Sequence, residues 1–211
     1  MSVRRYFASK DTTITNAFKS NLQTRATNAN MGESDILEVF NIYGQASTSS
    51  VELARILIQF PTQEISSDRN NKKIGISGSS QFILKLSNAP HSDSTPKKFN
   101  ITVSPISSSW LEGSGLDMET YMDIGATNWI SSSTGTLWNN EGGDYLSQSY
   151  TQYFENGTED LEIDITSLVE MWLTGSIQNN GLIVKLDSAE ETGIDSYYTK
   201  KFFARGSEDR K

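Results

Sequence analysis

A short apolar helix that leads directly into a strand is the feature that most constrains how this chain can fold. The apolar side chains between 168 and 173 predict a helix over 165–174 with a broad apolar face. Ser167 and Glu170 have the S-x-x-E spacing of a capping box, and Gly175 stands where helix ends favour glycine. Isolated helices shorter than about 12 residues are marginal in water. We therefore expect this helix to dock on a sheet, to which the apolar run 181–186 contributes a buried strand.

The remaining segments read as strands and turns. Residues 51–60 alternate, and the face that carries Ala54, Ile56, Ile58 and Phe60 is uniformly apolar, so it should point inward. Further strands are expected at 9–16, 36–43, 81–86, 99–106, 161–163 and 197–204, with a turn at 44–50 and a polar loop at 61–79. Because no βαβ alternation and no repeat occurs, the pattern predicts an all-β fold. We expect an antiparallel β-sandwich, a jelly roll, that forms a single domain over 1–211 with one short helix.

Composition excludes several classes of protein. The chain has 211 residues and no cysteine, which excludes disulfides and thiolate chemistry. Its net charge of −8 argues against a nucleic-acid partner. No run approaches the roughly 18 apolar residues of a membrane span. Residues 1–7 are not followed by the apolar region of a signal peptide, so we expect a product made in the cytoplasm.

Five segments occur in the order typical of one family. They are Leu57–Phe60, Trp110–Gly115 (similar to a W-x-E-G-x-G turn), Gly125–Trp129, Asp164–Leu186 and Phe203–Glu208. Together they resemble the DNRLRE-like domains, which are related to the disaggregatase-associated modules and to a group of carbohydrate-binding modules. The resemblance extends from about Arg5 to Lys211, and the 164–186 block is its most specific part.

This resemblance implies a jelly roll of the kind found in cell-surface proteins and in virion proteins of marine tailed phages. It also implies that the motif residues are scaffold: Trp110, Glu112, Gly113, Asp164, Trp172 and Gly181. The chain departs from the pattern at Gln59-Phe60-Pro61, where the family has leucine-arginine-phenylalanine-aspartate. It also stops at Arg210-Lys211, before the family's final strand. A strand beyond 211, or one from a partner, is therefore expected to complete the sandwich.

The longest irregular region, 107–143, carries most of the candidate binding residues. Trp129 and Trp138 lie between Gly- and Ser-rich stretches, and with Tyr121 and Tyr145 they are candidates for ligand contacts. The alternative for the two tryptophans is that both fold inward to plug the end of the sheet. A sugar site is also conceivable where Trp110 and Tyr121 accompany the carboxylates Glu112, Asp117 and Glu119, although a structural role for Trp110 and Glu112 is favoured.

No pattern indicates catalysis. His91, the only histidine, stands in a polar loop without partners for a triad or a metal. No G-x-S-x-G elbow appears, and Gly113-Ser114-Gly115 lacks the lysine of a phosphate-binding loop. A glycosidase would need paired carboxylates that the sequence alone cannot place. We expect no catalytic residue, no cofactor and no metal site, with a structural calcium at Asp11 and Asp187 left open.

Two functions follow as expectations. The first is a non-catalytic virion structural protein of a tailed phage, a jelly-roll module that packs against other virion subunits in many copies or as a homo-oligomer. The second is a carbohydrate-binding module of a cell-surface or polysaccharide-degrading protein. The two are compatible, since a module in a virion can contact host-surface glycans, and an enzyme acting on polysaccharide is a third, weaker alternative.

Overall fold

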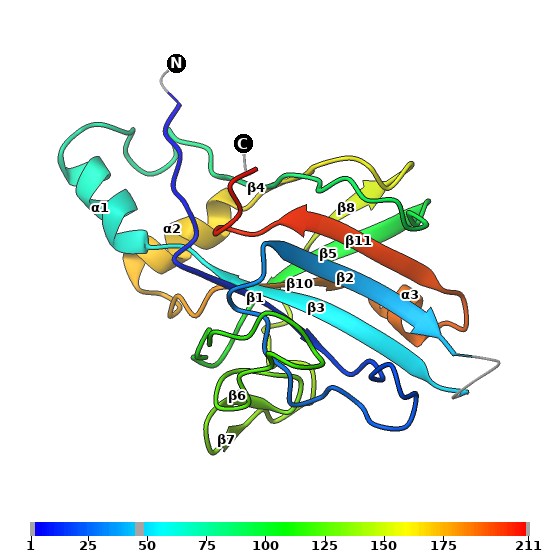
Figure 1. Ribbon diagram of the computed structural model, residues 1–211. Helices are drawn as coiled ribbons and strands as arrows, with labels where there is room; N and C mark the ends of the chain where they lie inside the picture. The colour runs from blue at the N-terminus through cyan, green and yellow to red at the C-terminus, as the bar shows by residue number, and fades with distance from the viewer. Residues whose placement is uncertain (1–2, 45–48, 210–211) are drawn as a thin grey trace.

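The computed structural model describes residues 3–44 and 49–209, and antiparallel strands make up most of its regular structure (Figure 1). The strands are β1 (Lys10–Thr15), β2 (Ile36–Tyr43), β3 (Val51–Gln59), β4 (Ile83–Leu86), β5 (Phe99–Pro105), β6 (Ser131–Ser133), β7 (Thr136–Leu137), β8 (Tyr150–Phe154), β9 (Leu161–Asp164), β10 (Leu182–Leu186) and β11 (Tyr197–Phe203). The helices are α1 (Thr62–Asn70), α2 (Thr166–Thr174) and α3 (Ser188–Thr192). The mostly β architecture expected from the sequence is confirmed, whereas the expectation of a single helix is wrong. None of the described helices is both long enough and apolar enough to cross a bilayer.

A curled seven-stranded antiparallel sheet forms the body of the protein. Its strand order is β11-β2-β3-β10-β5-β8, and β1 also pairs with β3. β3 is the hub, because β2 pairs with its first part, where Phe40 lies opposite Ala54, and β10 pairs with its second part, where Leu182 lies opposite Ile58. β3 therefore joins β11 and β2 on one side of the curled sheet to β10, β5 and β8 on the other.

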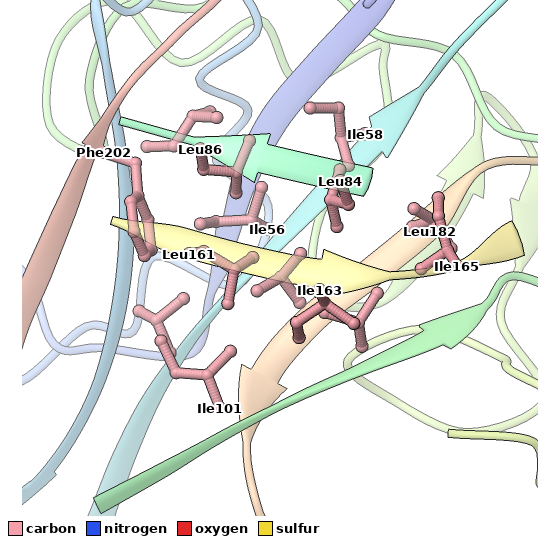
Figure 2. Packing of buried hydrophobic residues seen from close by; sticks show 14 of the residues in the cluster. Ile56, Ile58, Leu84, Leu86, Ile101, Leu161, Ile163, Ile165, Leu182 and Phe202 are labelled. Carbon is pink, nitrogen blue, oxygen red and sulfur yellow. The ribbon is translucent and has the colours of Figure 1, made fainter. Parts of the chain in front are cut away.

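The concave face of this sheet is filled by the main apolar core. Ile56 and Ile58 of β3 point into it and are buried, and Phe60 packs against it, as the alternation predicts. Ala54, also predicted to point inward, is instead buried in a separate small cluster with Ala17 and Phe40. A two-stranded ribbon of β4 and β9 covers this face, and Figure 2 shows side chains of both ribbon strands packed against those of the sheet, among them Leu84, Leu161 and Ile163. Complete burial of each such side chain stabilises the fold by roughly 1.5–3 kcal/mol.

The ribbon also spans from one edge of the curled sheet to the other. On the β11 side, Asn88 forms an isolated bridge with Phe202, and the backbone N–H of Ala89 donates to the carbonyl of Lys201. On the β8 side, the side chain of Gln152 hydrogen-bonds to the backbone of β9 and of the preceding residue. The second layer is thus a narrow ribbon with helices beside it, and the structure does not show the two large facing sheets of the expected sandwich.

Helix α2 lies where the sequence predicts a helix, but it does not begin as predicted. Its apolar face packs into the core, and Gly175 ends it with a φ of +73°. The prediction of a capping box is wrong, because the Ser167 hydroxyl hydrogen-bonds to the Tyr150 hydroxyl and Glu170 pairs with Arg69 of α1. The backbone N–H of Thr166 is instead satisfied by Oδ1 of the motif residue Asp164.

Helices α1 and α3 were not expected. The polar stretch 61–79 contains α1, whose buried residues are Ile65 and Asp68. The carboxylate of Asp68 pairs with Arg4 and accepts a hydrogen bond from Tyr6. Helix α3 carries a true capping box, in which Asp187 caps backbone N–H groups and Glu190 reaches back. Part of the turn expected at 44–50 lies outside the described residues. The chain end at 210–211 lies wholly outside them.

Candidate functional site

The segment 107–146, here called the cap, covers the outer face of the sheet and turns its tryptophans inward. Trp110, Trp129 and Trp138 are only 3%, 4% and 6% exposed and pack with Leu57 and Ile183 of the sheet. The indole N–H of Trp110 donates to the carbonyl of residue 180, and that of Trp138 to the carbonyl of residue 128. Buried indoles need such partners. The tryptophans therefore anchor the cap.

Of the four aromatic residues proposed as ligand contacts, two are buried and two are exposed. The structure adopts the inward alternative for Trp129 and Trp138, so neither ring can act as an open stacking platform. Tyr121 and Tyr145 remain available, with 62% and 39% of their surfaces exposed. A ligand role for these two stays a prediction.

The glycine turn around residues 110–115 is structural. The carboxylate of Glu112 accepts the backbone N–H of Asp11 and forms an ion pair with Arg205 at 2.7 Å. Gly113 has a φ of +80°, and a Cβ there would collide with Ala126 and with the buried side chain of Asn30. No sequence pattern singles out that asparagine, yet its amide bonds to the backbone of both ends of the turn. The favoured structural role of Trp110 and Glu112 agrees with these contacts.

The acidic residues of the cap build turns. The backbone N–H groups of Thr120, Tyr121 and Glu119 donate to Oδ1 of Asp117 and hold the pKa of that carboxyl below its usual value. Glu119 accepts the backbone N–H of Ser20. One oxygen of each of these carboxylates therefore holds a turn, and the sugar or calcium site considered for this loop stays a prediction.

The two aspartates proposed for calcium do not meet. Asp11 lies opposite Ile58, beside the start of β10, and accepts the backbone N–H of Arg205, whereas Asp187 follows the end of β10 and caps α3. In the part of the chain that the structure describes, no group of three or more His, Asp or Glu side chains could hold a metal ion. Of the other motif residues, Trp172 is buried on α2, and Gly181 has a φ of +92° against the carbonyl of Ile58.

Among the described residues, eight of the sixteen large apolar side chains that are exposed belong to the cap. The backbone beneath them is held by hydrogen bonds, for example from Leu111 N–H to the Ser132 carbonyl and from Trp138 N–H to the Ile130 carbonyl. The side chains therefore occupy defined positions. The exposed set comprises Leu111, Leu116, Tyr121, Ile124, Ile130, Leu137, Tyr145 and Leu146.

A depression of about 370 Å³ lies beside Tyr145, between the cap, the sheet and α3. Beneath it, Glu191 of α3 joins Arg55 of β3 by two hydrogen bonds of 2.8 Å and Lys185 of β10 at 3.3 Å. The Lys185 ammonium also lies 5.5 Å from the ring centre of Tyr145. Strand alternation alone did not reveal this buried ionic cluster, because its partners come from three distant segments. The depression is otherwise lined mainly by hydroxyls: Thr102, Ser104, Ser147, Ser149 and Ser188.

A wider hollow of about 740 Å³ lies over the outer faces of β2 and β11. Phe40 forms part of its floor and Tyr198 part of its wall. Lys201 crosses it to pair with Glu38 at 3.4 Å and Asp93 at 3.0 Å. His91 lies just before Ser92, the first of three consecutive residues that line this hollow, and its Nδ1 is 3.8 Å from Oδ2 of Asp93. Among the described residues around this hollow, none forms a nucleophile–base pair.

No protein-family model matches the chain, and no curated protein is detectably similar to it. The likeness to the DNRLRE-like domains therefore depends on the quoted segments alone, and the site must be argued from its geometry.

Proposed function

We propose that this protein is a non-catalytic structural module of a tailed-phage virion that packs against other virion subunits through the outer surface of the cap. The observation that carries the proposal is the set of exposed apolar side chains on a cap whose backbone is held in place. The resemblance of the 110–115 and 164–186 segments to a family with virion members supports the same assignment. We also infer that the curled sheet with its ribbon is a jelly-roll variant.

The physical argument concerns solvation. Monomeric proteins rarely expose large contiguous apolar patches, and such patches mark interaction sites. Leu137 and Ile124 are exposed to 70% and 67%, and the inward tryptophans fix the backbone that presents them. A surface of this kind can bind a partner without the entropic penalty of ordering a loop.

Sedimentation velocity of the purified protein tests the homo-oligomeric form of this proposal. We expect association at micromolar concentration, and we expect Leu111→Ser with Leu137→Ser to return the protein to a monomer. Ile76→Ser is the matched control, because Ile76 is equally exposed but lies outside the cap, after α1. Association that survives the cap variant, or that Ile76→Ser abolishes, would assign the contact to another surface.

The partner can also be a different virion subunit. In that case a monomeric protein should still be incorporated into particles assembled in infected cells, and the cap variant should not. Absence of the wild-type protein from purified particles would refute the virion assignment.

The depression beside Tyr145 favours the second candidate function, carbohydrate binding. An aromatic ring next to several hydroxyls and the Asp187 carboxylate offers both a stacking surface and hydrogen-bond partners for a sugar. On a glycan array, Tyr145→Ala should remove binding, whereas Tyr121→Ala, which alters a ring outside the depression, should not. A wild-type protein that binds no glycan would eliminate this candidate.

A further inference from the structure

Lys200 is a lysine buried where the alternation of β11 requires an apolar residue. It is 0% exposed and shares the inward face of the strand with Phe202. Its Nζ lies 5.4 Å from the ring centre of Phe154 and 4.8 Å from that of Phe202. A buried amine among aromatic rings is costly unless its donors are used.

The amine lies at the seam where the ribbon meets the curled sheet. Nζ donates to the carbonyls of Gly157 and Glu159, each at 2.9 Å, and to Oδ1 of Asn88. Asn88 lies two residues beyond the end of β4 and forms an isolated bridge with Phe202 of β11, whereas residues 157 and 159 connect β8 to β9. The Lys200 amine thus joins β11 to two segments that are distant from it in the sequence.

The environment makes this amine a nucleophile. Burial lowers the pKa of Lys200 to about 8, and the nearby carboxylates of Glu159 and Asp160 act in the opposite direction. Lys85, which pairs with Asp160, is the further charged group on the ribbon side. A desolvated lysine of this kind is partly neutral near physiological pH and can attack a carbonyl carbon.

Asn88 presents the electrophile. Its side-chain oxygen contacts Nζ, whereas its Nδ2 has no hydrogen-bond partner among the described residues. The backbone that carries the carboxamide is held by the N–H of Asn88, which donates to Oδ1 of Asp160 at 2.8 Å. Holding two reactants in contact is equivalent to giving them a very high effective concentration.

We propose that Lys200 and Asn88 join in an intramolecular isopeptide bond that ties β11 to the ribbon. The ammonium first loses one proton, and the neutral amine adds to Cγ of Asn88. The second proton passes to Nδ2, the Cγ–Nδ2 bond breaks, and ammonia leaves. An amine and a carboxamide thereby give a secondary amide and ammonia, so no oxidant, reductant or further reactant is needed.

Glu159 is the carboxylate that we assign to accept the proton released by Lys200. Its Oε1 accepts the backbone N–H groups of residues 155 and 156, while its Oε2 is buried without a hydrogen-bond partner. A buried carboxylate oxygen without a partner can accept a proton, and the charge of this carboxylate acts on the Lys200 amine. Asp160, by contrast, acts as a positioning residue.

Intact-mass spectrometry of the denatured full chain tests the proposal, after incubation about one pH unit above the Lys200 pKa. We expect a protein lighter than its sequence by one ammonia. Trypsin should then release the peptide 86–97 joined to 186–201, with cleavage after Lys200 blocked. Lys200→Arg and Asn88→Ala should restore the full mass, and Glu159→Gln should slow the loss.

Lys185→Arg is the matched control, since Lys185 is also buried but contacts a carboxylate and no carboxamide. It should retain the loss of ammonia. A wild-type protein of full mass after incubation would overturn the proposal, whatever the variants do. So would an ammonia loss confined to the peptides with Asn156-Gly157 or Asn180-Gly181, because succinimide formation there also releases ammonia.

Discussion

Neutralising Glu191 should unfold this protein more readily than any other single change to its charges. The carboxylate binds Arg55 through two hydrogen bonds of 2.8 Å and Lys185 at 3.3 Å, and all three side chains are almost completely buried. Glu191→Gln keeps the shape of the side chain but leaves two cations in the interior with no counter-charge from this residue. Breaking a buried ion pair from one side is strongly destabilising.

The magnitude follows from the distances. Both cations contact Oε2 of Glu191, so their nitrogens lie at most about 6 Å apart, the sum of the two contacts. At an effective dielectric constant of about 20, two like charges at that separation repel by about 3 kcal/mol in both proteins, and in Glu191→Gln the attraction of the carboxylate no longer offsets this repulsion. Since charge-assisted hydrogen bonds are lost as well, we expect a total of about 3–5 kcal/mol. That is a large part of the 5–15 kcal/mol of free energy that typically stabilises a domain.

Urea denaturation at pH 7, followed by tryptophan fluorescence and circular dichroism, measures this change. Adding Lys185→Met to Glu191→Gln removes one unpaired cation and should restore part of the loss. Glu155→Gln is the control, because its pair with Lys98 is exposed and 4.0 Å long, so the change should stay within about 0.5 kcal/mol. A cost below about 1 kcal/mol for Glu191→Gln, or no recovery in the double variant, would show that water reaches the cluster and refute the reasoning.

Two further predictions concern helix α2 and the cap. Ser167→Ala should cost less than about 0.5 kcal/mol, whereas Glu170→Gln should cost about 1–2 kcal/mol by urea denaturation, because Glu170 pairs with Arg69 and caps nothing. The hydrogen bonds from Arg69 lower the folded-state pKa of Glu170, so its contribution is present above the unfolded-state pKa and is lost as the pH falls through the lowered value; a cost that persists in acid would contradict this. Trp138→Ala should destabilise the fold by about 3–5 kcal/mol, whereas Tyr121→Ala should leave the Tm unchanged, and equal effects would mean that the cap is not anchored as described.

Elements with a strong local pattern were predictable from the sequence. The alternation of β3 identified its inward face because every second residue is apolar over the whole strand. Helix α2 and its terminal Gly175 were identified because the apolar face and the glycine are local signals. The S-x-x-E pattern misled, however, since α2 begins earlier than that pattern implies and Glu170 finds a stronger partner in Arg69. Helix α1 was missed because it buries only one apolar side chain, Ile65.

The layers and the candidate sites were not predictable, because they depend on contacts between distant segments. Nothing in the sequence near Asn30 or Arg55 shows that these side chains hold the cap or bind Glu191. The burial of Trp129 illustrates the same limit: a tryptophan between glycine- and serine-rich stretches has no local signal for its direction. The direction of the Trp129 side chain is determined by the outer face of the sheet, where the indole covers Leu57.

β10 shows why the cap must serve stability and recognition together. All five of its residues are buried, so the strand is covered on both faces, by the ribbon with its core on one side and by the cap on the other. The cap cannot open to admit a ligand without exposing Ile183 and the cation of Lys185 to water. A partner that binds the outer surface of the closed cap should therefore raise the Tm, because it binds the folded state alone. A partner that lowers the Tm must act by opening the cap, which would place the binding surface on the buried tryptophans instead.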